Sequence, residues 1–96
     1  MTNDDIRAIL RDKYGDDSVL DEIVMFENPS YSTAVIGISD DDRLIYDYGK
    51  MIEFLMDEDG MDMYEAIEFI DFNTIRAIGY QSSLGKMPII MYGIDE

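Results

Sequence analysis

The chain has 96 residues and a formal net charge of −15, from 22 acidic and seven basic residues. It contains no cysteine and no histidine, which excludes disulfides, thiol nucleophiles, imidazole bases and thiolate or imidazole metal cages. With 47% hydrophobic residues, it has the composition of one folded domain over residues 1–96, not of a disordered acidic tail. No stretch approaches the ~18 apolar residues of a membrane span, and the acidic N-terminus is unlike a secretory signal. We therefore expect a cytoplasmic protein.

The first third of the chain predicts a helix and then an ambiguous segment. A helix over residues 3–14 can be capped by Thr2 or Asn3 and stopped by Gly15. The apolar residues of 18–26 have helical spacing, yet they also fit a short buried strand. We favour a strand over 22–27, because the Asn-Pro-Ser turn signal at 28–30 precedes another apolar run. The helical interpretation of 18–26 stays open at this point.

The middle of the chain predicts a β-hairpin. Residues 33–39 are rich in β-branched side chains and predict a central strand. The three aspartates at 40–42 indicate a turn, and residues 43–46 return as the next strand. The simplest role for the three aspartates is that of a solvated hairpin tip.

Two consecutive helices follow the hairpin. Asp47 can cap a helix over 48–59 that ends at Gly60. A second helix over 62–78 begins with the capping-box pair Asp62 and Glu65. Its second half is apolar on more than one side, which is typical of a buried helix or of one that meets a partner.

The last elements are a loop over 80–87 and an edge strand over 88–92. Gly79 is the expected stop of the preceding helix. The element order is thus α-β-β-β-α-α-β. This order predicts an α+β fold, in which helices pack on one face of a small antiparallel sheet of three to four strands.

The negative charge is unevenly distributed. Twelve of the 22 acidic residues fall within 40–71, against two basic residues, whereas the last 25 residues carry no net charge. Such a segment repels nucleic acid and acidic membranes and attracts basic surfaces. Carboxylates three or four residues apart on a helix lie ~5–6 Å apart at Cβ, so rows of them can approximate a phosphate track. We expect a basic protein partner, and neither direct nucleic-acid binding nor membrane binding.

Carboxylate chemistry is the main alternative to a binding role. The sequence around residues 57–60 is similar to part of a calcium-binding EF-hand loop, which needs glycine at position 6 and an oxygen ligand at position 1. Placing Gly60 at position 6 puts Leu55 at position 1, and placing Asp57 at position 1 puts Asp62 where glycine belongs. The chain also lacks a phosphate-binding glycine motif. We therefore expect no enzyme, no cofactor and no dedicated metal site, with a weak cation site at the acidic cluster left open.

Several sequence blocks carry a resemblance to a known group of proteins. They are Glu27-Asn28-Pro29-Ser30-Tyr31, Ala34-Val35-Ile36-Gly37, residues 43–48 with Met51, Glu58-Asp59-Gly60-Met61, residues 65–70, residues 73–77 and Pro88-Ile89. Together they resemble a family of small acidic proteins from Firmicutes phages, prophages and mobile elements. The resemblance brings no catalytic site. It implies a protein that acts on host machinery, with anti-CRISPR or anti-restriction proteins that mimic nucleic acid as the closest functional parallel.

Three hypotheses follow from the sequence. The first is a non-enzymatic protein of a phage or mobile element that binds the basic surface of a host nucleic-acid-processing protein as a nucleic-acid mimic. The second is an interaction or self-association module that uses an apolar patch on 69–78 or on the edge of 88–92, and the third is a carboxylate metal enzyme. The predicted partner-binding residues of the first hypothesis are all acidic: Asp40, Asp41, Asp42, Glu53, Asp57, Glu58, Asp59, Asp62, Glu65, Glu68 and Asp71.

Overall fold

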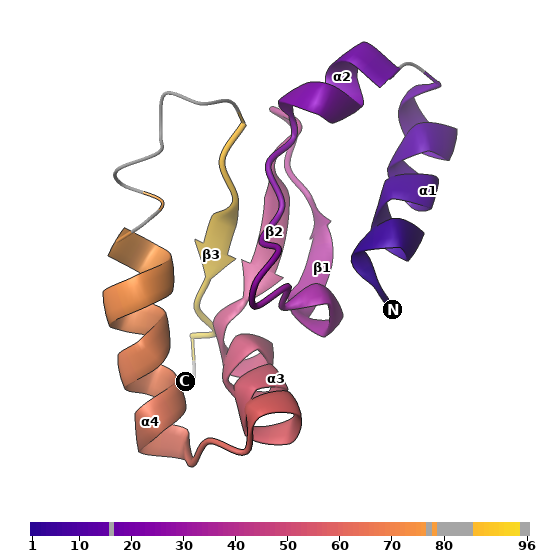
Figure 1. Ribbon diagram of the computed structural model, residues 1–96. Coiled ribbons are helices and arrows are strands. Elements are labelled where there is room, and N and C mark those ends of the chain that lie inside the picture. The colour runs from indigo at the N-terminus through magenta and orange to yellow at the C-terminus, as the bar shows by residue number, and fades with distance from the viewer. Residues whose placement is uncertain (16, 77, 79–85, 95–96) are drawn as a thin grey trace.

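A computed structural model of the chain describes residues 1–15, 17–76, 78 and 86–94 (Figure 1). The fold is α+β, as predicted, and four helices accompany a small three-stranded sheet. In chain order the elements are α1 (Asn3–Tyr14), α2 (Asp17–Glu22), the 3₁₀ turn η1 (Ser32–Ala34), β1 (Val35–Ile38), β2 (Leu44–Asp47), α3 (Tyr48–Asp59), α4 (Met63–Phe69), the π-helical segment η2 (Ile70–Ile75) and β3 (Ile89–Met91).

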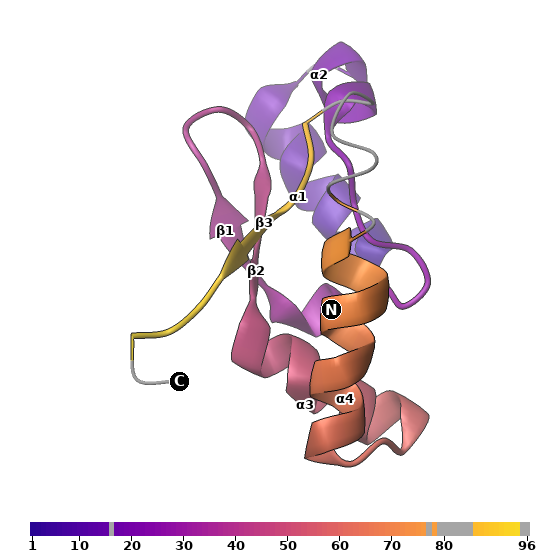
Figure 2. The same ribbon diagram turned by 90° about the vertical axis from the view of Figure 1, so that its left-hand side faces the viewer.

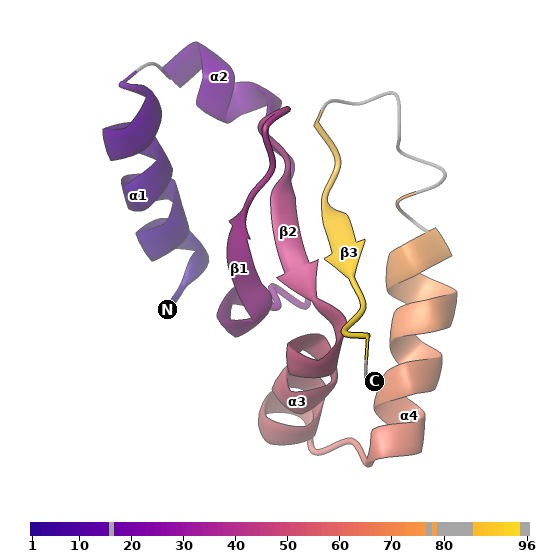
Figure 3. The ribbon, with the colours of Figure 1, turned by 180° about the vertical axis from the view of Figure 1, so that it is seen from behind.

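The sheet is mixed, which corrects the antiparallel sheet expected from the sequence. Its strand order is β1-β2-β3, with β1 antiparallel and β3 parallel to β2. The direction of β3 follows from the helices, because α4 and η2 run back along the sheet toward the end where β2 begins (Figures 1 and 3). β3 is an edge strand, as predicted.

The central strand is β2 and not β1, so the prediction of a central strand at 33–39 is wrong in position. The 3₁₀ turn occupies Ser32–Ala34, so β1 begins only at Val35. Among the described strands, β1 pairs with β2 alone. Leu44 and Tyr46 of β2 are buried, whereas Ile36 of β1 is 44% exposed. A β-branched run marks a strand, but the sequence contains no signal for how many neighbours that strand has.

The helical alternative for 18–26 holds only as far as Glu22, and the preferred strand over 22–27 is wrong. Helix α2 ends at Glu22, and only Ile23 forms a bridge, to Lys86. Side chains then replace a strand ladder: the Phe26 amide donates to Tyr46 Oη, and Asn3 Nδ2 donates to the Phe26 carbonyl. The backbone of Phe26 is thereby satisfied by side chains, whereas Glu22 and Val24 bond the backbone of Lys86.

Local helix signals were accurate. Thr2, Asp47 and Asp62 each accept a hydrogen bond from a backbone amide of the first helical turn, with capping boxes at Thr2 and Asp62. Gly15 and Gly60 close α1 and α3 in the left-handed conformation. These signals depend on a few neighbouring residues, so tertiary packing has little power to override them.

The helix expected over 62–78 is not a uniform α-helix. It is α-helical to Phe69, π-helical from Ile70 to Ile75, and helical again at Arg76. The expected stop at Gly79 and most of the expected loop over 80–87 lie outside the described residues. π-helical turns are rare in proteins, and those that do occur are often found at functional sites.

The helices and the segment before β1 cover one face of the sheet, as Figure 2 shows. The core between these layers contains Tyr31, Tyr46, Met51, Leu55 and Ile70, all fully buried. Figure 3 shows the opposite face, which none of the described helices crosses. Within the described part of the chain, no helix has the length and apolar character needed to span a membrane.

Candidate functional site

The structure divides the eleven predicted binding residues into two groups. Asp40, Asp41 and Asp42 lie at the turn between β1 and β2, at one end of the sheet (Figure 1). The other eight lie on α3, α4, their connection and η2, around the opposite end. One continuous track through all eleven carboxylates is therefore not formed.

The turn at 40–42 makes internal contacts. Asp42 Oδ1 accepts a hydrogen bond of 2.5 Å from the Tyr14 hydroxyl, and this bond raises the pKa of Tyr14 to about 12. Asp41 accepts from Ser39 Oγ, a bond that lowers the pKa of Asp41, and lies 3.8 Å from Arg43. These contacts attach the turn to α1 and to its own strands, so it serves the fold.

The second group is largely uncompensated. We call it the acidic hairpin, and all its members are exposed: Glu53, Asp57, Glu58, Asp59, Asp62, Glu65, Glu68 and Asp71. Within the described residues the ion pairs involve Arg7, Arg11 and Arg43, none of which contacts this group. Asp62 and Glu65 form the capping box of α4, and Asp71 accepts a hydrogen bond from Tyr48.

Three acids of the acidic hairpin occupy an unfavourable place. Asp57, Glu58 and Asp59 form the last turn of α3, which contains no basic residue. The C-terminus of a helix carries a partial negative charge, and a charged side chain within the last turn interacts with it by ~0.3–1 kcal/mol. Here the sign is repulsive for each carboxylate. The fold thus holds three negative charges together where they reduce its own stability.

Apolar side chains are exposed among these acids. Tyr64 is 82% exposed and Phe72 54% exposed. Phe72 also lines a shallow groove of about 410 Å³, together with Met61, Glu65, Glu68, Phe69 and Asn73. The sequence signal for this patch was the helix that is apolar on more than one side. Of the two alternatives for this half of the helix, burial holds for Ile70 but not for Phe72.

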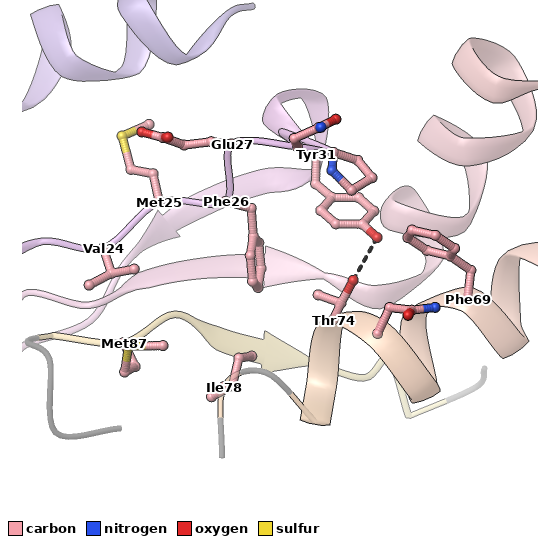
Figure 4. Close-up of a pocket in the computed structure, with 12 residues that line it drawn as sticks. Val24, Met25, Phe26, Glu27, Tyr31, Phe69, Thr74, Ile78 and Met87 are labelled. Atoms are coloured by element: carbon pink, nitrogen blue, oxygen red, sulfur yellow. Dashed lines mark hydrogen bonds between the residues drawn. The ribbon is translucent and has the colours of Figure 1, made fainter. Parts of the chain in front are cut away.

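A second hollow was not anticipated from the sequence. Figure 4 shows a cavity of about 450 Å³ between the segment before β1 and the π-helical segment. Its lining comprises Val24, Met25, Phe26, Glu27, Asn28, Pro29, Tyr31, Phe69, Asn73, Thr74, Ile78 and Met87. The only sequence signal here was the turn at 28–30, whose Asn28-Pro29 peptide bond is cis.

The sequence left a weak cation site open at the acidic cluster. Among the residues the structure describes, no three carboxylates are grouped so that they could hold a metal ion. In the cavity, burial raises the pKa of the Tyr31 hydroxyl, which therefore stays protonated at neutral pH.

The fold and these surfaces define a class: a small α+β protein with a mixed three-stranded sheet and a strongly acidic helical hairpin. Comparisons of the chain with protein-family models, with curated proteins and with solved structures find no match.

Proposed function

We propose that this protein is a non-enzymatic inhibitor or modulator of a nucleic-acid-processing protein of a bacterial host. Its acidic hairpin would bind the basic channel that normally holds the phosphate backbone. The binding would take place in the cytoplasm of the host cell. The resemblance to phage and mobile-element proteins gives the biological context of this proposal.

The observation that carries the proposal is the charge at the end of α3. Asp57, Glu58 and Asp59 repel the helix terminus and each other, and within the described residues no basic side chain pairs with them. Local features that reduce stability are expected at functional sites. A basic partner would neutralise the three carboxylates and relieve the repulsion on binding.

The exposed apolar side chains support a protein partner. Interfaces owe most of their affinity to a few aromatic or long side chains, surrounded by polar contacts. Tyr64 and Phe72 lie on the same helical segment as Glu65 and Glu68. The carboxylates would steer the encounter, and the aromatic side chains would give the complex its residence time.

A pair of charge-matched variants tests the proposal. The first combines Asp57→Lys, Glu58→Lys and Glu68→Lys, and leaves the capping residues Asp62 and Glu65 in place. The second, the control, combines Asp12→Lys, Asp21→Lys and Glu22→Lys on α1 and α2, all exposed. Each variant changes the net charge by the same amount, so only the position of the charge differs between them.

The measurement is binding to purified Cas effector nucleases and restriction enzymes, in competition with duplex DNA and at low and high salt. We expect the wild-type protein and the control to bind and to compete with DNA. The first variant should lose binding, and binding should weaken steeply as salt rises. Equal binding by both variants, or complexes that form without displacing DNA, would reject nucleic-acid mimicry.

A second candidate function is an interaction module that uses apolar contacts. The observation that favours it is the exposure of Met91 and Tyr92, which gives the β3 edge an apolar face. Self-association through this face would respond little to salt. Sedimentation at several protein concentrations, with Met91→Lys as the disrupting variant, separates it from the charge-driven proposal.

A further inference from the structure

The cavity of Figure 4 has features that the acidic hairpin does not explain. Its volume of about 450 Å³ lies within the range of small-molecule sites. Three aromatic rings, those of Phe26, Tyr31 and Phe69, contribute to its walls, as Figure 4 shows. Apolar walls with a few polar groups are the usual composition of a ligand site.

Backbone geometry is unusual on both sides of this cavity. Tyr31 has a φ of 49°, in the left-handed region that bulky residues rarely enter. Such a conformation costs on the order of 1–3 kcal/mol and persists only where the surroundings enforce it. Here the enforcing contacts are the complete burial of the ring and an edge-on contact with Phe26, whose centroid lies 5.5 Å away.

The π-helical segment builds the facing wall. In an α-helix, residue i+5 lies roughly 140° around the axis from residue i. In a π-helix the hydrogen bonds connect i with i+5, so residues i+4 and i+5 both return to the side of residue i. Phe69, Asn73 and Thr74 have this spacing, and all three line the cavity. The wider turn thus brings Thr74 to the wall beside Phe69.

The two unusual segments meet in one hydrogen bond. Tyr31 Oη and Thr74 Oγ1 lie 2.8 Å apart and are buried, and either atom can donate (Figure 4). Each hydroxyl has one donor hydrogen and acceptor lone pairs. One bond between them consumes one donor and leaves lone pairs on both oxygens. Tyr31 is fully buried, whereas Thr74 is 6% exposed, so Thr74 is the member of the pair that a ligand can reach. The side-chain amide of Asn73 adds another acceptor.

The charge of the lining limits the ligand. Among the described lining residues there is no lysine or arginine, and the one carboxylate, Glu27, is exposed and lies 3.3 Å from Arg7. An anion would therefore have no counter-charge in a protein of net charge −15. A cation gains from this field and from the faces of the aromatic rings.

We propose that this cavity binds a small organic amine, with an aromatic or branched apolar body against Phe26 and Phe69, the two partly exposed aromatic side chains of the lining. Its protonated nitrogen would donate hydrogen bonds to the oxygens of Thr74 and Asn73. The ligand is a free small molecule. This proposal is independent of the partner of the acidic hairpin.

The test is a ¹H–¹⁵N NMR titration of the full-length protein with four probes that separate shape from charge. Phenethylamine has the aryl body and the cation, phenethyl alcohol has the body without charge, phenylacetate has the body with the opposite charge, and ethylamine has the cation without the body. We expect phenethylamine to shift the amides of residues 26–31 and 73–74 saturably. It should bind about threefold to thirtyfold more tightly than the alcohol, from the strength of a cation–π contact.

Two variants locate the binding. Asn73→Trp replaces an exposed lining residue with a side chain large enough to fill the cavity, and it should abolish the shifts at 26–31. The control Met63→Trp adds the same ring at an exposed position of α4 outside the lining, and it should bind as the wild type does. Circular dichroism establishes that both variants are folded.

Three results would overturn the proposal. Ethylamine could reproduce the phenethylamine shifts, the shifts could be confined to the acidic hairpin, or Asn73→Trp could leave them unchanged. A further arm uses the peptide N-acetyl-Phe-Arg-amide, and binding of this peptide without binding of phenethylamine would assign the cavity to a protein partner instead. The variant with lysine at positions 57, 58 and 68 should still bind phenethylamine. Loss of binding to the nucleic-acid-processing partner and loss of amine binding are therefore separate results, so either proposal can fail without the other.

Discussion

Tyr14, the last residue of α1, donates a 2.5 Å hydrogen bond to Asp42 in the turn between β1 and β2. These residues are 28 positions apart in the chain, and the bond joins the first helix to the tip of the hairpin. Asp42 reaches it from a left-handed conformation, with φ of 64°. The contact explains why one of the three turn aspartates is half-buried and not a free surface charge.

Replacing Tyr14 with phenylalanine should lower the free energy of unfolding by about 0.5–1.5 kcal/mol, and by more if the Asp42 carboxylate stays poorly solvated. Urea denaturation at pH 7 measures the effect. Asp42→Asn is the matched control, since it keeps an acceptor oxygen at the same place and should cost less. A Tyr14→Phe variant as stable as the wild type would show that the bond contributes nothing net.

The same bond predicts a pH dependence. The folded state raises the pKa of Tyr14 to about 12, from ~10 in the unfolded chain. The protonated phenol is therefore favoured by folding, so its stabilisation is complete below pH ~10 and is lost as the pH rises toward about 12. Tyr46, whose pKa burial also raises to about 12, acts in the same direction. Stability between pH 10 and 12 should fall less steeply in Tyr14→Phe than in the wild type.

Tyr46 should be more sensitive than Tyr14. Its ring is fully buried, and its hydroxyl accepts the amide of Phe26 at 3.2 Å. Tyr46→Phe leaves that amide without its acceptor, which should cost about 1–3 kcal/mol of unfolding free energy. Chemical denaturation gives the magnitude, and amide hydrogen exchange at Phe26 should accelerate. Unchanged exchange there would argue against the hydroxyl as the acceptor.

The end of α3 should gain stability when its charges are removed. Asp57→Asn and Glu58→Gln should each raise the free energy of unfolding, by about 0.3–1 kcal/mol, because the carboxylates repel the helix terminus. The gain should shrink at high salt, which screens the repulsion. Thermal unfolding at two salt concentrations checks both statements. Destabilisation by these variants would remove the main support for a functional role of the charge.

Two glycines provide an internal comparison. Gly60 ends α3 with φ of 68°, and no neighbouring atom would obstruct a methyl group there. Gly60→Ala should therefore destabilise through backbone conformation alone, by roughly 1–2 kcal/mol. At Gly37, in β1, a methyl group would also meet no neighbouring atom, but the backbone there is not in the left-handed conformation. Gly37→Ala should be neutral or slightly stabilising, and similar losses in the two variants would point to packing instead.

The helix ends could be read from the sequence because a cap is a local device. Thr2, Asp47 and Asp62 each bond an amide about three residues away, and Gly60 needs only its own backbone freedom. The acidic composition of α3 and α4 was equally visible. The sequence could not show that these acids lie at the opposite end of the sheet from the turn at 40–42. That distance arises because strand β2 runs from the turn to the start of α3.

By itself, the sequence determined the α+β class, the helix ends, the hairpin turn and the excess of negative charge, since each depends on residues close together in the chain. The tertiary structure decided the edge position of β1, the parallel direction of β3 and the π-helical turn. It also decided the cavity between Tyr31 and Thr74, which are 43 residues apart. These features follow from packing between distant segments, where burial and hydrogen bonds to remote side chains outweigh local propensity.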